Sequence, residues 1–109
     1  MPIDLEARLL RQVTEVLTAH VPECEVWVFG SRATKGAKRF SDLDLAIVSP
    51  TALPVRRLAL LASAFEESDL PIKVDLVDWK SSSPEFRKRI AEHHEVLVRP
   101  DKQIPPHSL

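Results

Sequence analysis

The sequence has one cysteine, no tyrosine and no long apolar run, and each shortage narrows the class of protein. Cys24 alone cannot form an internal disulfide. No signal peptide opens the chain, and no apolar stretch approaches the roughly 20 residues that span a bilayer. We therefore expect a cytoplasmic protein without a membrane partner, in which Cys24 is a small residue at the entry to a strand.

The sequence also has almost no net charge. Its 109 residues carry a formal charge of -1 at pH 7, which gives no general attraction to nucleic acid or to anionic membranes. Without tyrosine, only Trp27 and Trp79 are large enough to act as stacking platforms, and we expect both to serve in packing instead. Direct nucleic-acid binding is therefore not expected.

The length and the hydrophobic pattern predict a single α+β domain, α/β-like in character, over residues 1–99, with a flexible tail at 100–109. Helical periodicity predicts three amphipathic helices, at about 3–19, 58–65 and 84–93. Apolar and alternating runs predict four strands, at about 26–29, 42–48, 72–78 and 95–99. These elements predict a small mixed sheet of about four strands flanked by helices.

Two short motifs lie at the ends of the first two predicted strands. Phe29-Gly30-Ser31-Arg32 ends the first strand, and Ser41-Asp42-Leu43-Asp44-Leu45 begins the second. Residues two apart on a strand point the same way, so Asp42 and Asp44 share a face. If these strands are antiparallel, Ser31 lies next to Asp42. Gly30 allows the backbone to turn sharply at the end of the first strand.

A third acid, Asp75, lies near the start of the third predicted strand. The second and third strands are joined through a whole helix, which is the usual crossover between parallel strands, so Asp75 should approach Asp42 and Asp44. Three close carboxylates repel one another unless cations balance them, and an all-oxygen cluster suits Mg²⁺ or Mn²⁺. Asp75 is also the natural candidate to deprotonate an acceptor hydroxyl.

A basic loop follows the glycine turn. Between Ser31 and Ser41 the loop has no acidic residue and four basic ones, Arg32, Lys35, Lys38 and Arg39. If Ser31 begins a short helix, its backbone N–H groups form an anion site, and a triphosphate bound there would reach the metals. Each motif alone is common at solvated strand ends and surface loops. Their combination predicts displacement at the α-phosphorus of a nucleoside triphosphate.

These motifs resemble those of a known superfamily. The pattern Gly-Ser, ten residues, Asp-x-Asp resembles the DNA polymerase β-type nucleotidyltransferases, especially with Asp75 on a later strand. The short length and the form Phe-Gly-Ser-Arg-Ala resemble the minimal nucleotidyltransferases, or MNT proteins, which pair with HEPN-domain toxins. The resemblance spans roughly residues 20–100 and implies the polymerase β-type nucleotidyltransferase fold.

The resemblance implies a role for each motif residue. It implies nucleotide binding by Gly30, Ser31 and, less firmly, Arg32. It implies metal ligation and catalysis by Asp42, Asp44 and Asp75. The expected cofactors are Mg²⁺ or Mn²⁺, with ATP as the nucleotidyl donor.

The expected function is that of an adenylyltransferase antitoxin. The chain has little room for an acceptor-binding domain, so we expect a HEPN toxin to be both partner and substrate, receiving AMP on a tyrosine or another hydroxyl. One alternative is a non-catalytic antitoxin that neutralises its partner by binding it. Another is nucleotidyl transfer to a small molecule or to RNA.

Overall fold

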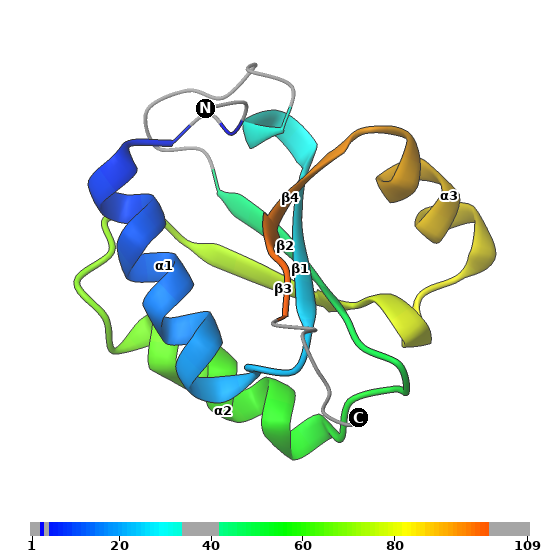
Figure 1. Ribbon diagram of the computed structural model, residues 1–109, viewed down its shortest axis with the longest axis horizontal. Coiled ribbons are helices and arrows are strands. Elements are labelled where there is room, and N and C mark those ends of the chain that lie inside the picture. The colour runs from blue at the N-terminus through cyan, green and yellow to red at the C-terminus, as the bar shows by residue number, and fades with distance from the viewer. Residues whose placement is uncertain (1–2, 4, 34–41, 101–109) are drawn as a thin grey trace, which may run out of the picture.

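Four strands form one mixed sheet, in the order β3-β2-β1-β4 (Figure 1). Their bounds are Glu25–Phe29 for β1, Leu43–Val48 for β2, Val74–Asp78 for β3 and His94–Val98 for β4. Strand β1 is antiparallel to both β2 and β4, and β2 runs parallel to β3. The computed structural model describes residue 3, residues 5–33 and residues 42–100. The predicted α+β fold with a small mixed sheet is thus confirmed.

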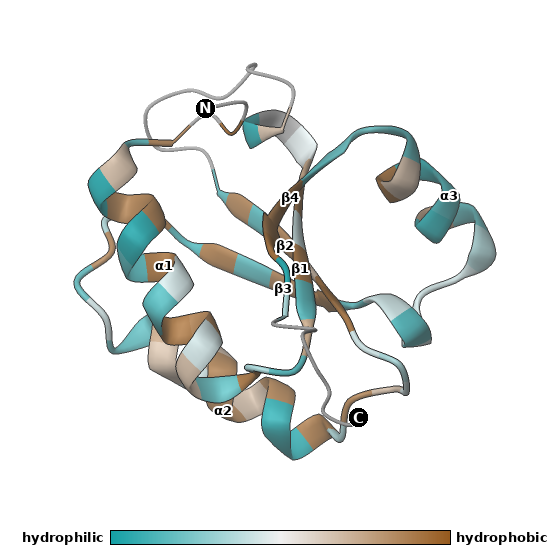
Figure 2. Cartoon of the chain, in the orientation of Figure 1, coloured by the Kyte–Doolittle hydropathy of each residue, from teal (hydrophilic) through white to brown (hydrophobic). Residues whose placement is uncertain are grey.

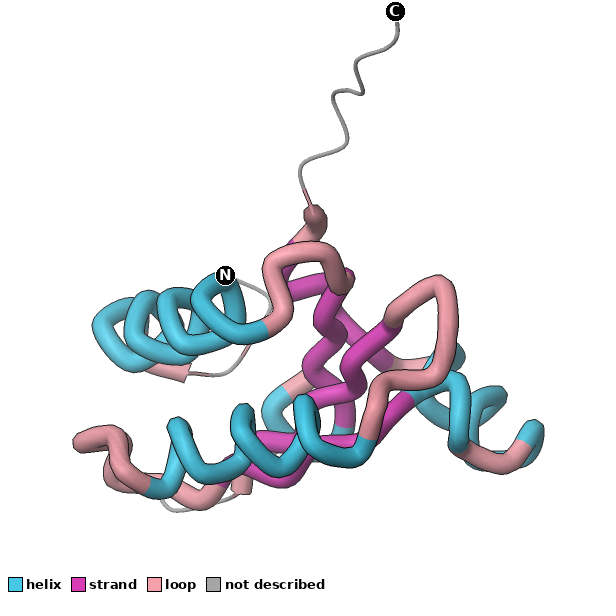
Figure 3. Tube along the Cα trace, turned by 90° about the horizontal axis from the view of Figure 1, so that it is seen from below, coloured by secondary structure: helices cyan, strands magenta, loops and turns pink. Residues whose placement is uncertain are grey.

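Three helices flank the sheet, and they are divided between its faces. Their bounds are Ala7–His20 for α1, Val55–Glu66 for α2 and Pro84–Glu92 for α3. Helices α1 and α2 pack together on one face, and α3 stands on the other side of the strands (Figures 1 and 3). Two helices therefore cover one face of the sheet, and a single short helix covers part of the other.

The hydrophobic core lies between the sheet and the α1–α2 layer. Along β1, Val26 and Val28 have no exposed surface, whereas the residues between them are partly exposed. Helix α1 contributes Leu10, Val13 and Leu17 to the same core. Apolar residues accordingly recur along α1, α2 and the strands (Figure 2). Because strand side chains alternate, the residues between these core positions point to the face on which α3 stands.

The start of α1 differs from the prediction. The helix begins at Ala7 and not near residue 3, because Ile3 is buried in the core and its carbonyl accepts a hydrogen bond from the Leu5 N–H at 2.9 Å. Glu6, at the N-cap, makes no side-chain capping bond. Burial of Ile3 and this tight turn thus replace the first predicted helical turn.

The other boundaries agree with the prediction to within about three residues. Ser83 caps α3 as predicted, with its side chain accepting a hydrogen bond from the Phe86 N–H at 3.1 Å, and Pro84 is the first helical residue. Cys24 is fully buried directly before β1, as expected. No helix in the described part of the chain is long and apolar enough to cross a membrane. Apart from Pro100, the predicted tail lies outside the described residues.

Adjacent leucines of α2 provide a matched test of this core. Leu61 has no exposed surface, whereas Leu60 is 54% exposed. Leu61→Ala should lower the free energy of unfolding by about 2–5 kcal/mol, because it removes buried methyl groups and leaves a cavity. Leu60→Ala should change it by less than about 0.5 kcal/mol. Equilibrium urea denaturation of both variants measures the difference, and equal losses would contradict this placement of α2.

Candidate functional site

The strand register places two of the predicted acids side by side. Asp75 of β3 pairs with Asp44 of β2, Asp44 pairs with Phe29 of β1, and Phe29 pairs with His94 of β4. Directly paired residues project from the same face of a sheet, and neighbouring strands lie about 4.8 Å apart. This row lies on the face opposite α1 and α2, and we call its two carboxylates, Asp44 and Asp75, the acid row. The parallel crossover therefore brings Asp75 beside Asp44, as predicted.

The glycine turn lies directly against Asp44. Gly30 opens a three-residue 3₁₀ helix, η1 (Gly30–Arg32), immediately after β1, and has a φ of 75°. That left-handed conformation favours glycine. A Cβ at this position would also collide with a carboxylate oxygen of Asp44. Position 30 therefore favours glycine through its backbone angle, and any larger residue would also displace the Asp44 carboxylate from its present position.

Negative charge accumulates around Asp44. Burial raises the pKa of the Asp44 carboxyl, and the nearby charges of Asp75 and Asp42 raise it further. Asp42 is exposed just before β2. A Lys73 ammonium lies 3.6 Å from an Asp75 carboxylate oxygen and balances part of this charge, although both side chains are open to solvent. The site is therefore an acidic patch with one half-buried carboxylate at its centre.

The three acids do not form a compact cluster as they stand. Within the described residues, no group of three histidine, cysteine or acidic side chains converges closely enough to hold a metal ion. Asp44 and Asp75 are neighbours in register, whereas Asp42 lies outside the strand and projects into solvent. Like charges repel, which favours this spreading of the carboxylates.

The basic residue of the motif points elsewhere. Arg32 is only 5% exposed and lines a cavity together with Leu5 and Leu9 from the α1 segment and Ile72 from the segment before β3. Arg32 therefore contributes to the surface beside the start of α1, and the pocket beside Gly30 is lined without it. The side chain of Ser31 and the predicted basic residues Lys35, Lys38 and Arg39 lie outside the described residues.

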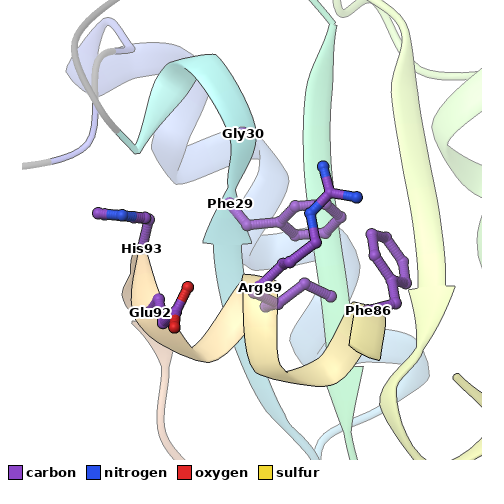
Figure 4. A pocket seen from close by; sticks show the side chains of 7 residues that line it. Phe29, Gly30, Phe86, Arg89, Glu92 and His93 are labelled. Atoms are coloured by element: carbon purple, nitrogen blue, oxygen red, sulfur yellow. The ribbon is translucent and has the colours of Figure 1, made fainter. Parts of the chain in front are cut away.

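A pocket that the sequence pattern did not reveal opens beside Gly30. It has a volume of about 390 Å³, lies between the end of β1 and α3, and is lined by Phe29, Gly30, Phe86, Arg89 and Ile90, with Glu92 and His93 at its rim (Figure 4). The Phe29 and Phe86 rings meet edge to face, with centroids 5.8 Å apart. The only signal in the sequence was the apolar spacing of Phe86 and Ile90, which indicates an inward face but not an open pocket.

The other aromatic residues on this face pack against one another. Trp27 stacks on His94 at 4.0 Å between ring centroids and meets Trp79 edge to face at 4.8 Å. The Trp27 indole N–H donates to a Glu25 carboxylate oxygen at 2.6 Å. The expectation that both tryptophans serve in packing is confirmed.

Comparisons with known proteins agree on one family. The sequence matches the family described as "Polymerase beta, Nucleotidyltransferase" over residues 11–103. A relative from Haemophilus influenzae, named "Probable protein adenylyltransferase MntA", is 41% identical over 102 residues, which is 94% of this chain and 90% of the relative.

Solved structures show the same fold. A crystal structure of a toxin-antitoxin with AMP-PNP aligns with a TM-score of 0.70 and 26% identity, covering 82% of this chain and 72% of that chain. A candidate minimal nucleotidyltransferase aligns with a TM-score of 0.65 and 28% identity, covering 84% of this chain and 95% of that chain.

Asp44→Asn should stabilise the metal-free protein, because the neutral amide removes a charge that burial and two acidic neighbours oppose. The pKa of Asp44 in the folded state lies above the ordinary value, which applies to the unfolded chain. At a pH between these two pKa values, the folded state holds a proton that the unfolded state has lost. The stability of the wild type should therefore rise as the pH falls through that window, and Asp44→Asn should lose this contribution. Urea denaturation across the acidic pH range measures both effects.

Asp69→Asn is the control for this prediction, because Asp69 is an exposed carboxylate in the loop after α2. Its free energy of unfolding should change little. If Asp44→Asn were no more stable at neutral pH than Asp69→Asn, the charge of Asp44 would not be a source of instability.

Proposed function

Because the chain belongs to the polymerase β nucleotidyltransferase family, we propose that it transfers AMP from ATP to a hydroxyl of a HEPN-domain toxin and thereby acts as the antitoxin. A tyrosine is the first candidate acceptor, and the cytoplasm is the expected location. The observation that carries the proposal is the glycine turn at Gly30, packed against Asp44, with Asp75 beside it in register. A phosphate-binding turn next to paired carboxylates is what nucleotidyl transfer requires.

The comparisons support the finer parts of this proposal. The relative at 41% identity is named as a protein adenylyltransferase, which favours AMP as the group transferred and a protein as the acceptor. The solved toxin-antitoxin with AMP-PNP favours ATP as donor and a toxin as partner. The resemblance of residues 29–33 to the minimal nucleotidyltransferases favours a HEPN domain in the partner of this chain.

In this proposal, Gly30 and Ser31 bind the triphosphate through the backbone N–H groups of the turn. The close approach of Gly30 to Asp44 would hold the phosphates against the acid row. Arg32, which is buried and lines the cavity beside Leu5 and Leu9, would hold the end of the turn in place. A direct contact of Arg32 with nucleotide remains a prediction from the motif.

The chemistry of the three acids fits a divalent cation, although their carboxylates would have to draw together to bind one. Asp42, Asp44 and Asp75 offer only carboxylate oxygens, the ligands that Mg²⁺ and Mn²⁺ prefer. Burial first, and then the neighbouring charges of Asp75 and Asp42, raise the pKa of the Asp44 carboxyl, so a bound cation would relieve both effects. When bound by these residues, the ion would neutralise phosphate charge and lower the pKa of the acceptor hydroxyl. We propose Mg²⁺ as the physiological ion.

Asp75 would serve as the general base. It lies on the edge strand β3 beside Asp44, with its side chain 41% exposed, so an acceptor from another protein can reach it. Asp75 would accept the proton as the hydroxyl oxygen forms a bond to the α-phosphorus of ATP. The bond from the α-phosphorus to the oxygen that bridges to the β-phosphate then breaks, and pyrophosphate leaves toward the Gly30 turn.

Adenylylation can be measured directly. The full chain is incubated with ATP, Mg²⁺ and the purified HEPN protein encoded beside it, and intact-mass spectrometry should show the toxin gaining the mass of one or more AMP groups. Asp42→Ala/Asp44→Ala should abolish the gain in mass, because the site would lose the carboxylates proposed to hold the metal ion. Asp75→Asn should slow the reaction by about 10²- to 10⁴-fold, the usual contribution of a general base. Asp69→Asn should react at the wild-type rate.

The same variants test the two alternative functions. If Asp42→Ala/Asp44→Ala neutralises the toxin as well as the wild type does, the protein acts by binding alone. If the wild type leaves the toxin unmodified but labels RNA or a small molecule with radioactive AMP, the acceptor class is wrong. Loss of neutralisation by the double variant, with complex formation retained, supports catalysis.

Metal binding has a readout that does not depend on activity. Mg²⁺ at about 100 times its dissociation constant should raise the free energy of unfolding by about 2.7 kcal/mol, because it binds only the folded state. Thermal denaturation with and without Mg²⁺ measures this stabilisation. Asp42→Asn/Asp44→Asn should show no such increase. An equal increase in that variant would place the ion elsewhere in the molecule.

A further inference from the structure

A pocket of the right size for a small ligand lies one strand away from the acid row. Its volume, about 390 Å³, falls within the range of about 300–1,000 Å³ that is common for small-molecule sites. Phe29 forms one wall and pairs directly with Asp44 across the sheet. Gly30 belongs both to this pocket and to the turn that packs against Asp44. A ligand held there would therefore be continuous with the acid site.

The walls of the pocket suit a flat, apolar ring. Phe29 and Phe86 meet edge to face and direct their rings to the same space, and buried Ile90 adds an aliphatic surface (Figure 4). In contrast, Trp27 is already stacked on His94. Base stacking on aromatic side chains is the usual way in which proteins hold a nucleobase without reading its sequence.

A cation stands at the mouth of the same pocket. Arg89, exposed on α3, extends its guanidinium group toward the space between the two phenylalanine rings (Figure 4). Guanidinium groups stack favourably on aromatic rings, and a purine placed between Arg89 and the phenylalanines would be covered on its outer face.

We propose that this pocket binds the base of the donor nucleotide, with Phe86 and Arg89 as its stacking residues. The assignment rests on the proposed function and adds to it the place of the base. A nucleotide whose phosphates lie along the Gly30 turn has its base within reach of the adjoining pocket. Asp75, the proposed general base of the reaction, is two strands from Phe29, roughly 10 Å across the sheet. The acceptor would therefore approach from the opposite side of Asp44.

Calorimetric titration of the full chain, with Mg²⁺ present, separates base binding from phosphate binding. Phe86→Leu keeps apolar volume but removes the aromatic face, and it should weaken ATP binding roughly 5- to 100-fold. Inorganic tripolyphosphate, which has no base, should bind this variant as it binds the wild type. Thermal denaturation verifies that the variant is folded.

Arg89 gives a second test at an exposed position, where folding is not at risk. Arg89→Gln should weaken ATP binding several-fold, whereas Lys88→Gln should leave it unchanged, because Lys88 is an exposed neighbour on α3 that does not line the pocket. Both changes remove one positive charge, so a general electrostatic effect would be equal in the two variants. Tripolyphosphate binding should be the same in both.

Three results would overturn the base pocket while leaving the proposed function intact. The first is an unchanged ATP affinity in both Phe86→Leu and Arg89→Gln. The second is that these variants bind ATP and tripolyphosphate more weakly by the same factor. The third is that they keep the wild-type ATP affinity but have a raised KM for the toxin. The last result would make the pocket a site for the acceptor. If the wild type binds neither ATP nor tripolyphosphate, the proposed function itself fails, and the base pocket fails with it.

Discussion

The approach of the Gly30 backbone to the Asp44 carboxylate is the constraint on which the rest of the site depends. A Cβ at position 30 would displace the Asp44 carboxylate, and the left-handed φ at this position favours glycine as well. The turn follows β1 without a linker, and Val26 and Val28 fix β1 in the core. Packing on the covered face of the sheet therefore determines where the turn meets the acid on the open face.

The charge of the acid row works against this well-packed framework. Asp44 is half-buried between Asp42 and Asp75, and all three influences on its pKa disfavour the ionised carboxylate. A sheet selected for stability alone would not have like charges at directly paired positions of neighbouring strands. Such local violations of the folding rules are characteristic of functional sites. A site that binds a cation has to place its negatively charged carboxylates together even when no cation is bound.

Connection lengths and alternation were sufficient to predict most of the fold and the pairing of the acids. A helix between two strands is the usual connection of parallel neighbours, and this expectation placed Asp75 beside Asp44 without knowledge of any contact. The orientation of Arg32 could not be predicted, because it depends on a 3₁₀ turn and on the cavity beside Leu5. The pocket at Phe86 was missed for a similar reason, since apolar spacing distinguishes an inward face from an outward one but not a filled space from an open one.

The strand order also explains how one small sheet could separate donor and acceptor. Asp44 occupies a central strand, with the Gly30 turn and the Phe86 pocket on its β1 side and Asp75 on the edge strand β3. An in-line displacement requires the entering oxygen and the leaving pyrophosphate on opposite sides of the α-phosphorus. In the proposed reaction, that requirement is met by the order β3-β2-β1 itself. An edge position for the general base then gives a large protein acceptor access without displacing the nucleotide.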